Sequence, residues 1–323
     1  MTSTCMPMVT APEVSLVKDN TFSSRYKASH VLGQGGFGCV FAGVRLCDGL
    51  PVAIKQVPKC SVTAWGFMNG VRVPLEFCLL HRVSHIPGVV KLVGGHDTDN
   101  VFFIIMERIE SCKDLYVFIK ERGALSEVTA RSFFRQVVHT VSDCHLAGVL
   151  HRDIKNENII VDLESLTLKL IDFGAGAYVE ETLDKNFFGT RLYCPPEWIQ
   201  HKKYDGIPAM MWSLGVLLYH MVCGHVPFHT NEEITSAQVR FQKEHSVSFQ
   251  CQHLILILLQ FHCQDRPSME QVLSHPWLCP ADETDISATD ISIDLIDSFL
   301  ETSTSMDFVD YISAIEAVAY CNE

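Results

Sequence analysis

The 323-residue sequence has no long uninterrupted hydrophobic run. Its longest aliphatic stretch, Leu254–Leu259, is far shorter than the roughly 20 apolar residues that a membrane-spanning helix needs. The first 25 residues contain no basic start followed by an apolar segment, which a secretory signal would require. We therefore expect a soluble protein that is neither secreted nor bound to a membrane.

The sequence also has no Cys-x-x-Cys pair, although it contains 13 cysteines. Their irregular spacing gives no disulfide framework, so we expect reduced thiols in a protein of the cytoplasm or the nucleus. Cys251, His253, His262 and Cys263 are metal-ligating residue types, but their intervals do not fit a zinc finger. We interpret these four residues as structural and assign no metal to them.

Lysine and arginine are absent from residues 281–323, which carry eleven Asp and Glu residues. The net charge of −13 therefore comes mostly from this tail, predicted over 280–323. Neither the tail nor the nearly neutral remainder has the basic stripe that nucleic acid binding needs, so we expect no such partner. Ile291, Leu295 and Phe299 recur at helical intervals. The tail is either disordered or self-docked, or it forms short acidic amphipathic helices that bind a basic partner or fold back on the chain.

The rest of the chain divides into a leader and two regions of different periodicity. Residues 1–25 are polar and aperiodic, which predicts a flexible leader. Residues 26–108 have short β-branched and aromatic runs broken by glycine, which indicate a small sheet with one helix over 74–83. Residues 113–279 have helical periods that end near Pro276 and Pro280. We therefore predict two unequal lobes joined by a segment over 107–113.

A glycine-rich segment, Gly33–Val40, lies between two predicted strands. Its glycines allow backbone amides to approach phosphate oxygens closely, because no Cβ intervenes. A similar motif marks dinucleotide-binding oxidoreductases, but those place a helix directly after the glycines, whereas a strand over 40–44 is predicted here. The segment therefore favours a flap over the phosphates of a nucleotide.

Lys55 ends the apolar strand Val52–Lys55, where an unpaired charge would be costly to bury. Glu76 on the predicted helix and the phosphates of a nucleotide would compensate that charge. The alternative is a lysine that extends from a surface strand into solvent. The other motifs in the chain favour the pair with Glu76.

The segment His151–Asn158 places a carboxylate, an ammonium group and a carboxamide within one loop. We predict that Asp153 accepts the proton of a hydroxyl nucleophile, Lys155 neutralises a transferring phosphoryl group and Asn158 binds Mg²⁺. Asp172, in the run Asp172–Gly174, would hold Mg²⁺ against the phosphates. Either segment alone is compatible with a polar surface turn, but the whole set in this order indicates phosphoryl transfer.

With these motifs, the sequence resembles the eukaryotic protein kinases over residues 26–279. The resemblance implies an α+β fold of two lobes, with an antiparallel-sheet N-lobe (26–108), a hinge (107–113) and a helical C-lobe (113–279). It also implies a buried ion pair between Glu197 and Arg266. Several stretches are similar to the Pim family of serine/threonine kinases, in which, as here, a residue other than aspartate occupies the position of Met210. These stretches are Leu50–Lys55, Glu121–Leu125, Ala130–Phe134, Gly148–Lys155 and Met221–Gly224.

The resemblance implies that ATP and Mg²⁺ bind between the lobes, with Asn158 and Asp172 as metal ligands. The expected catalytic residues are Asp153, Lys155, Asn158, Lys55 and Asp172. The expected nucleotide site consists of Leu32, Gly33, Gln34, Gly35, Gly36, Phe37, Gly38, Cys39, Val40, Ala53, Lys55, Glu76, Glu107, Asp114, Ile160 and Ile171. The Pim family has a proline where this hinge has Ile109, so an additional backbone N–H is available here.

We expect transfer of the γ-phosphoryl group of ATP to serine and threonine hydroxyls of proteins. Lys155 after the catalytic aspartate and Gly189–Thr190 before the substrate-binding turn are typical of serine/threonine kinases. As in Pim kinases, a carboxylate of the segment 172–197 is expected to replace the activation-loop phosphate that Arg152 would otherwise bind. The alternative is a pseudokinase or scaffold that has the fold without the activity. The presence of every required side chain favours the enzyme.

Protein substrates are expected to carry arginine near the phosphorylated residue, about three positions before it. The acidic residues expected to bind this arginine are Asp114, Glu157, Glu107 and Glu110. Asn156, His220 and His225 stand where the family has acidic residues, so selectivity for a more distant arginine should be weaker, most of all at acidic pH. We also expect the protein to be a monomer.

Overall fold

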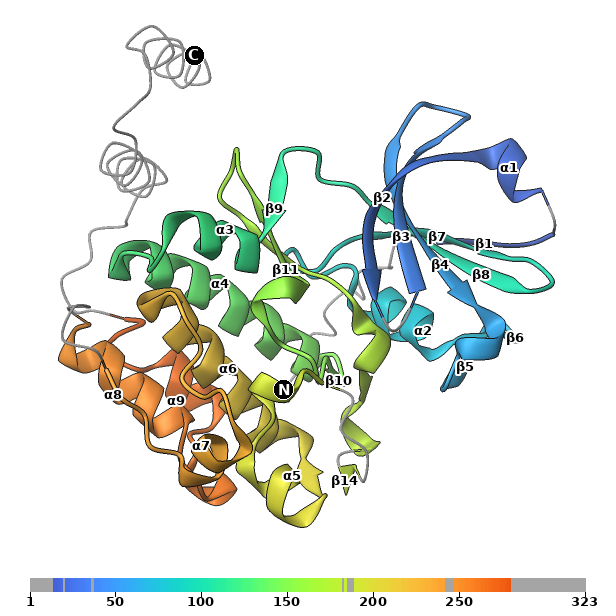
Figure 1. The fold of residues 1–323 in the computed structure, drawn as a ribbon. Coiled ribbons are helices and arrows are strands. Elements are labelled where there is room, and N and C mark those ends of the chain that lie inside the picture. The colour runs from blue at the N-terminus through green and yellow to red at the C-terminus, as the bar shows by residue number, and fades with distance from the viewer. Residues whose placement is uncertain are drawn as a thin grey trace, which may run out of the picture.

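The computed structural model describes residues 14–279, except 20, 36–37, 182, 185–188 and 242–246, and of 181, 183 and 184 only the backbone. The acidic tail predicted over 280–323 lies outside the described residues. Figure 1 shows a smaller lobe of strands with α2 beside it, and a larger lobe of helices. The predicted two-lobed α+β kinase fold is confirmed.

The smaller lobe is built on a six-stranded sheet with the order β1-β7-β8-β4-β3-β2. Neighbouring strands are antiparallel, except that β1 and β7 are parallel. A separate hairpin, β5–β6, leads into α2. The strands are β1 (Ser15–Lys18), β2 (Tyr26–Gly35), β3 (Gly38–Arg45), β4 (Pro51–Pro58), β5 (Trp65–Met68), β6 (Val71–Pro74), β7 (Leu92–Asp97) and β8 (Val101–Glu107).

The predicted flexible leader over residues 1–25 is partly structured, which corrects the expectation for its second half. Residues 15–18 form β1, and α1 (Phe22–Arg25) follows. The Phe22 ring stacks on Phe103 of β8 with centroids 3.9 Å apart. These few apolar residues are ordered by an existing sheet edge, and such tertiary contacts leave no period in the sequence.

Helix α2 (Leu75–Val83) is the main helix of the smaller lobe and lies where the sequence predicts it. Its apolar side is buried, including Phe77, Leu79 and Leu80. Glu76 is 9% exposed and is the one acidic residue of this helix. The helix therefore carries a single negative charge into the protein interior, where it needs a cationic partner.

The larger lobe contains seven described α-helices and short strand pairs. The helices are α3 (Leu115–Arg122), α4 (Glu127–Leu146), α5 (Pro196–His201), α6 (Gly206–Cys223), α7 (Asn231–Ser236), α8 (Phe249–Leu258) and α9 (Met269–Leu273). The strands are β9 (Cys112–Asp114), β10 (Val149–Leu150), β11 (Ile159–Asp162), β12 (Leu168–Leu170), β13 (Ala177–Tyr178), β14 (Leu183–Asp184) and β15 (Tyr204–Asp205). Single 3₁₀ turns include η2 (Asn156–Asn158), η3 (Phe173–Ala175) and η5 (Arg191–Tyr193).

Helix α6 is the central helix of the larger lobe. Within the described ranges it is the one helix long and apolar enough to cross a membrane, but 83% of it is buried inside the protein. Its Trp212 is fully buried and stacks on Phe228 with centroids 5.5 Å apart. These contacts identify α6 as a core helix.

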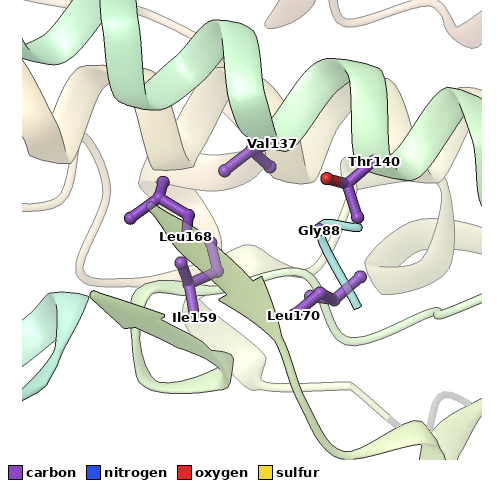
Figure 2. Close-up of a pocket in the computed structure, with 6 residues that line it drawn as sticks. All are labelled: Gly88, Val137, Thr140, Ile159, Leu168 and Leu170. Atoms are coloured by element: carbon purple, nitrogen blue, oxygen red, sulfur yellow. The ribbon is translucent and has the colours of Figure 1, made fainter. Parts of the chain in front are cut away.

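A small cavity of about 10 Å³ lies between α4 and the β11–β12 pair, beside Gly88 (Figure 2). Thr140 of α4 lies directly against Gly88, and a Cβ built on Gly88 would be 1.8 Å from Thr140 Oγ1. The bare backbone of Gly88 therefore allows this segment to pack against α4. The cavity has room for a single water at most. Its lining residues are Gly88, Val137, Thr140, Ile159, Leu168 and Leu170.

Candidate active site

The glycine-rich segment forms the turn between β2 and β3, with Gly33 paired to Val40 and Gly35 paired to Gly38. A strand follows the glycines, as predicted, which excludes the dinucleotide-binding arrangement. Gly38 has φ of +129°, and a Cβ there would lie 2.3 Å from the backbone oxygen of Gln56, so only glycine fits. Gly36 and Phe37, at the tip, lie outside the described residues.

The predicted apolar walls of the nucleotide site come from both lobes. Val40 and Ala53 lie half-buried on β3 and β4, and Leu32 on β2 is 48% exposed. Ile160 lies on β11 and Ile171 follows β12, and both are half-buried. These positions leave apolar surface for a planar ring, and their role in binding adenine stays a prediction.

Lys55 lies between two carboxylates. Its Nζ is 2.5 Å from Glu76 Oε1 and 2.7 Å from Asp172 Oδ1, and the Lys55 side chain is 4% exposed. Strand β4, helix α2 and the segment after β12 therefore meet at this one ammonium group. The predicted pair between Lys55 and Glu76 is confirmed, and the alternative of a lysine extended into solvent is wrong.

The charges in this group respond to burial and to one another. Burial alone would lower the pKa of Lys55, but the carboxylates of Glu76 and Asp172 outweigh it and raise that pKa. Burial raises the pKa of Glu76. For Asp172, burial is outweighed by the Lys55 charge and by a hydrogen bond from the Gly174 N–H, so its pKa is lowered. Lys55 and Asp172 are therefore charged at neutral pH.

Asp153 is 8% exposed, and both of its carboxylate oxygens have defined partners. Oδ1 accepts hydrogen bonds from the Thr190 N–H at 2.8 Å and from Thr190 Oγ1 at 3.1 Å. Oδ2 accepts from Asn158 Nδ2 at 2.9 Å and lies 2.8 Å from Lys155 Nζ. Lys155 also donates to Thr190 Oγ1 at 2.6 Å. The three residues predicted for the catalytic loop are thus brought together.

Thr190 is the part of this network that the motifs alone did not reveal. It lies 37 positions after Asp153, directly before η5, and joins Asp153 to Lys155. Gly189–Thr190 is typical of serine/threonine kinases, but that pattern does not predict these hydrogen bonds. No local spacing could have predicted them, because the contact depends on how the segment before η5 returns to the catalytic loop.

His151 links the catalytic loop to the segment that carries Asp172. Its Nε2 donates to the Ile171 carbonyl at 2.8 Å, while its Nδ1 accepts from the Asp153 N–H at 3.3 Å. These two bonds require the neutral ring, and burial lowers the pKa of His151 accordingly. Arg152 and Asp172 both have positive φ, 63° and 62°, a strained conformation for residues with a side chain. The surrounding contacts therefore hold this loop in one shape.

Asn158 and Asp172 fit the requirements of a Mg²⁺ ion. Asn158 uses its Nδ2 for the Asp153 carbonyl and carboxylate, which leaves its Oδ1 for a ligand. The Asp172 side chain is 34% exposed, although its neighbours Lys55 and Glu76 are buried. Two hard oxygen ligands suit an ion that takes its other ligands from phosphates and water.

The hinge connects β8 to β9 through residues 108–111. Cys112 Sγ donates to the Ile109 carbonyl at 3.1 Å. Within the described part of the chain, the Ile109 N–H has no hydrogen-bond partner. This donor is therefore available to a ligand, as the absence of proline at this position predicts.

Two acidic residues near the hinge, Glu107 and Asp114, have hydrogen-bond partners that the sequence did not predict. Glu107 Oε1 accepts from the Lys91 N–H at 2.9 Å and lies 3.2 Å from Lys169 Nζ. Glu107 is therefore engaged through Oε1 by a lysine and a backbone amide, and the expectation that it attracts a substrate arginine stays a prediction. Asp114 caps α3 by accepting from the Val117 N–H at 2.8 Å, whereas the Glu110 side chain is 67% exposed.

The histidine that stands beside the catalytic loop is an interior residue. His220 of α6 is 7% exposed, and its Nδ1 accepts from Asn156 Nδ2 at 2.7 Å. Burial, with a smaller contribution from His225, lowers the pKa of His220 to about 4. His220 is thus neutral in mildly acidic solution. The expectation that its protonation repels arginine there is therefore wrong.

The segment 172–197 is only partly described. Arg152 donates to the carbonyl of Ala175 at 2.7 Å and, more weakly, to that of Gly176 at 3.3 Å. Thr182 and the side chains of Glu181 and Asp184 lie outside the described residues. The expected carboxylate substitute for a phosphate therefore stays a prediction.

The expected ion pair between Glu197 and Arg266 is confirmed. Arg266 Nη1 and Nη2 donate to the two Glu197 oxygens at 2.8 and 2.6 Å, and the Arg266 side chain is fully buried. Arg266 also donates to the Pro208 carbonyl at 2.8 Å. The pair fixes α5 against the start of α6, directly after the segment that carries Thr190.

Comparison with known proteins agrees with this geometry. The protein kinase domain family matches residues 26–278, which defines the class of the protein as a protein kinase. Serine/threonine-protein kinase pim-2 of Danio rerio is 42% identical over 267 residues, which are 80% of this chain and 86% of that protein. Serine/threonine-protein kinase prk-2 of Caenorhabditis elegans is also 42% identical, over 80% of this chain and 59% of that protein. A PAS domain-containing serine/threonine-protein kinase of Mus musculus is 34% identical over 80% of this chain, which spans 19% of that protein.

The chain therefore belongs to the Pim-like serine/threonine protein kinases. Enzymes of the protein kinase family phosphorylate proteins and in general use ATP with Mg²⁺. The residues that define the class, Lys55, Glu76, Asp153, Asn158 and Asp172, are the ones whose contacts the structure brings together.

Proposed function

We propose that this chain transfers the γ-phosphoryl group of Mg²⁺-bound ATP to serine or threonine hydroxyls of protein substrates. The observation that carries the proposal is the network in which Asp153 is held by Thr190, Asn158 and Lys155. A carboxylate with both oxygens positioned by fixed donors can orient a hydroxyl and accept its proton without reorganisation. The intact network also favours an active enzyme over a pseudokinase.

Each of the other residues has a separate task in this proposal. Lys155 places a positive charge next to the carboxylate that would receive the proton, so it can stabilise negative charge on a transferring phosphoryl group. Lys55, held by Glu76, binds phosphate oxygens of the nucleotide. Mg²⁺, held by Asn158 and Asp172, would neutralise phosphate charge. In-line transfer then depends on positioning and electrostatics rather than on a covalent intermediate.

The test is phosphorylation of a serine peptide with ATP and Mg²⁺ by the full chain, compared with Asp153→Asn. Asparagine keeps the size and the acceptor oxygen of Asp153 but removes the charge that takes up a proton. We expect kcat to fall by at least about a hundredfold, since a general base contributes about 10²–10⁴. Equal rates for both proteins, or no transfer by the wild type, would contradict the proposal.

We further propose that substrates carry an arginine about three positions before the phosphorylated residue. Glu157 is exposed on η2, which packs against α3, where Asp114 lies at the N-cap. Glu110 is exposed in the hinge. Charge-assisted hydrogen bonds from a guanidinium to such carboxylates favour basic peptides. Glu157 and Glu110 carry most of this role, because Glu107 and Asp114 each accept a hydrogen bond from a backbone amide of the protein.

Selectivity for a more distant arginine is proposed to be weak. Asn156 and His220 are both buried and neutral and bond to one another, so neither offers a charge to a guanidinium. The measurement is kcat/KM for peptides with and without the distal arginine, in wild type and in a His220→Asp, His225→Asp double variant. We expect the arginine to matter more in the double variant. Strong dependence in the wild type that the double variant leaves unchanged would refute this assignment.

Activity without activation-loop phosphorylation is a further part of the proposal. It is supported by the contacts of Arg152 with the start of the segment 172–197, where the backbone carbonyls of Ala175 and Gly176 accept hydrogen bonds from the guanidinium. A phosphatase-treated chain and a Thr182→Ala variant should retain most of the activity. Loss of activity in both would overturn this part alone, since phosphoryl transfer by the untreated chain would remain. We also propose a monomeric protein of the cytoplasm or nucleus without membrane or nucleic acid partners, which sedimentation and cell fractionation can test.

A further inference from the structure

The edge strand β1 brings Leu16 to the same point of the sheet as a residue of α2. Leu16 pairs with Gly95 of β7. A Cβ built on Gly95 would lie 2.7 and 2.8 Å from two ring carbons of Phe77 and 3.1 Å from Leu16 Cδ1. Leu16 and Phe77 therefore lie against the same bare stretch of backbone, where Phe77 belongs to the main hydrophobic core and the partly buried Leu16 packs against that core.

Phe77 is the residue next to Glu76 in α2. It is fully buried, and its ring packs edge-on against Phe102 of β8 with centroids 5.2 Å apart. A helical turn is nearly rigid, so a displacement of Phe77 also moves Glu76, whose carboxylate is 2.5 Å from Lys55. The packing around Phe77 consequently affects the distance between Glu76 and Lys55 in the active site.

Three contacts fix the chain shortly after β1. His96 is 1% exposed, and its Nε2 donates to the Asp19 carbonyl at 2.8 Å. Phe22 stacks on Phe103 at 3.9 Å and meets the His96 ring edge-on at 5.5 Å. These contacts anchor Asp19 and Phe22 on β7 and β8, so the register that places Leu16 beside Gly95 is held at the C-terminal end of β1.

We propose that Leu16 is a positioning residue for phosphoryl transfer, because it packs beside Phe77 and thereby holds α2 where Glu76 reaches Lys55. The N-terminal strand then supports the active arrangement of α2 from outside the nucleotide site. This inference rests on the function proposed above for Lys55 and Glu76. It also gives the chain a means of keeping α2 in place that does not depend on a phosphate in the segment 172–197.

Val17 provides a matched control within the same strand. Successive strand residues point to opposite faces, so Val17 projects away from the face on which Leu16 meets Phe77. In agreement, Leu16 packs against the main core, whereas Val17 does not among the described residues. Leu16→Ala and Val17→Ala both shorten an aliphatic side chain of β1, but only the first removes the support of α2. Leu16→Met restores the apolar volume.

The experiment measures kcat, the KM for ATP and hydrogen exchange of the α2 amides in the full chain for these three variants. We expect Leu16→Ala to lower kcat/KM for ATP at least about fivefold, the lower end of couplings between separate sites. Exchange in α2 should accelerate in parallel, and Leu16→Met should restore both. Val17→Ala should leave both unchanged.

Two outcomes would overturn the inference. One is a Leu16→Ala protein whose α2 exchange equals that of Val17→Ala. The other is a protein that loses thermal stability while kcat/KM and α2 exchange, measured well below the melting temperature, stay at the wild-type values. The exchange measurement needs no catalysis, so it distinguishes failure of this inference from failure of the proposed function, which the Asp153→Asn comparison tests separately.

Discussion

Stability in mildly acidic solution should depend on His220, whose ring is surrounded by the Asn156 amide, the Tyr116 ring and His225. Burial lowers its pKa from 6.5 to about 4 in the folded protein. The folded state thus binds a proton less readily than the unfolded state. The corresponding stability is present above about pH 6.5 and is lost as the pH falls toward about 4.

The size of the effect follows from this shift. One pKa unit corresponds to about 1.4 kcal/mol, so complete protonation of His220 would cost about 3 kcal/mol of folding free energy. At about pH 5 the unfolded chain is already protonated at this residue while the folded chain is mostly not, and the loss is about 2 kcal/mol. This loss is a substantial part of the unfolding free energy of a whole domain, which is typically about 5–15 kcal/mol.

The assay is urea unfolding of wild type and His220→Asn between about pH 7 and about pH 5. Asparagine can present an acceptor near the position of Nδ1 and does not titrate, so the bond from Asn156 can persist. The wild type should lose about 2 kcal/mol more than the variant over this range. Parallel curves for wild type and His220→Asn would refute the reasoning.

Three further perturbations test other parts of the structure. Ile109→Pro removes the available hinge N–H and should weaken ATP binding by about 1 kcal/mol, measured as Kd, and an unchanged Kd would contradict it. Gly88→Ala should destabilise the fold by about 1–3 kcal/mol because its Cβ would collide with Thr140. Adding Thr140→Ala should recover part of that loss, and strict additivity in denaturant unfolding would contradict the contact. Asp172→Asn should abolish transfer with little loss of stability, whereas Lys55→Met should abolish transfer and also cost about 3–5 kcal/mol, because it leaves Glu76 buried without its cation. Peptide phosphorylation measures the loss of transfer in both variants, and thermal unfolding shows whether only Lys55→Met also loses stability.

The chemistry of the site could be predicted from the sequence because it depends on residue types in a fixed order. The glycine turn, Lys55 and Asp153 have few other reasons to occur together. The predicted helix over 74–83 and the strand after the glycines are confirmed for a related reason, since their apolar residues recur at one clear period. The local sequence pattern was therefore sufficient to predict the motifs and these two elements.

Contacts that join distant segments could not be predicted in this way. Thr190 reaches Asp153 across 37 positions, and Leu16 reaches the neighbourhood of Phe77 through the edge of a sheet. Residues 15–18 and 21–25 have few apolar side chains and no period, so their placement depends on the edge of β7 and on Phe103 of β8. We expected Glu107 to attract a substrate arginine because it is an acidic residue near the hinge. Its carboxylate instead lies 3.2 Å from the ammonium group of Lys169, which is far away in the sequence.

Asn156 and His220 both depart from the acidic residues of the Pim family, and the two replacements bond to one another. Two carboxylates facing each other at these positions would repel unless a cation lay between them. An amide and a neutral imidazole instead satisfy one another through the 2.7 Å bond from Asn156 Nδ2 to His220 Nδ1. A guanidinium would then have to break that bond and would find only the Asn156 Oδ1, which is buried and without a partner among the described residues. Restoring one acid alone should therefore recover less distal-arginine selectivity than restoring both, because a single carboxylate beside a neutral donor is already satisfied within the protein.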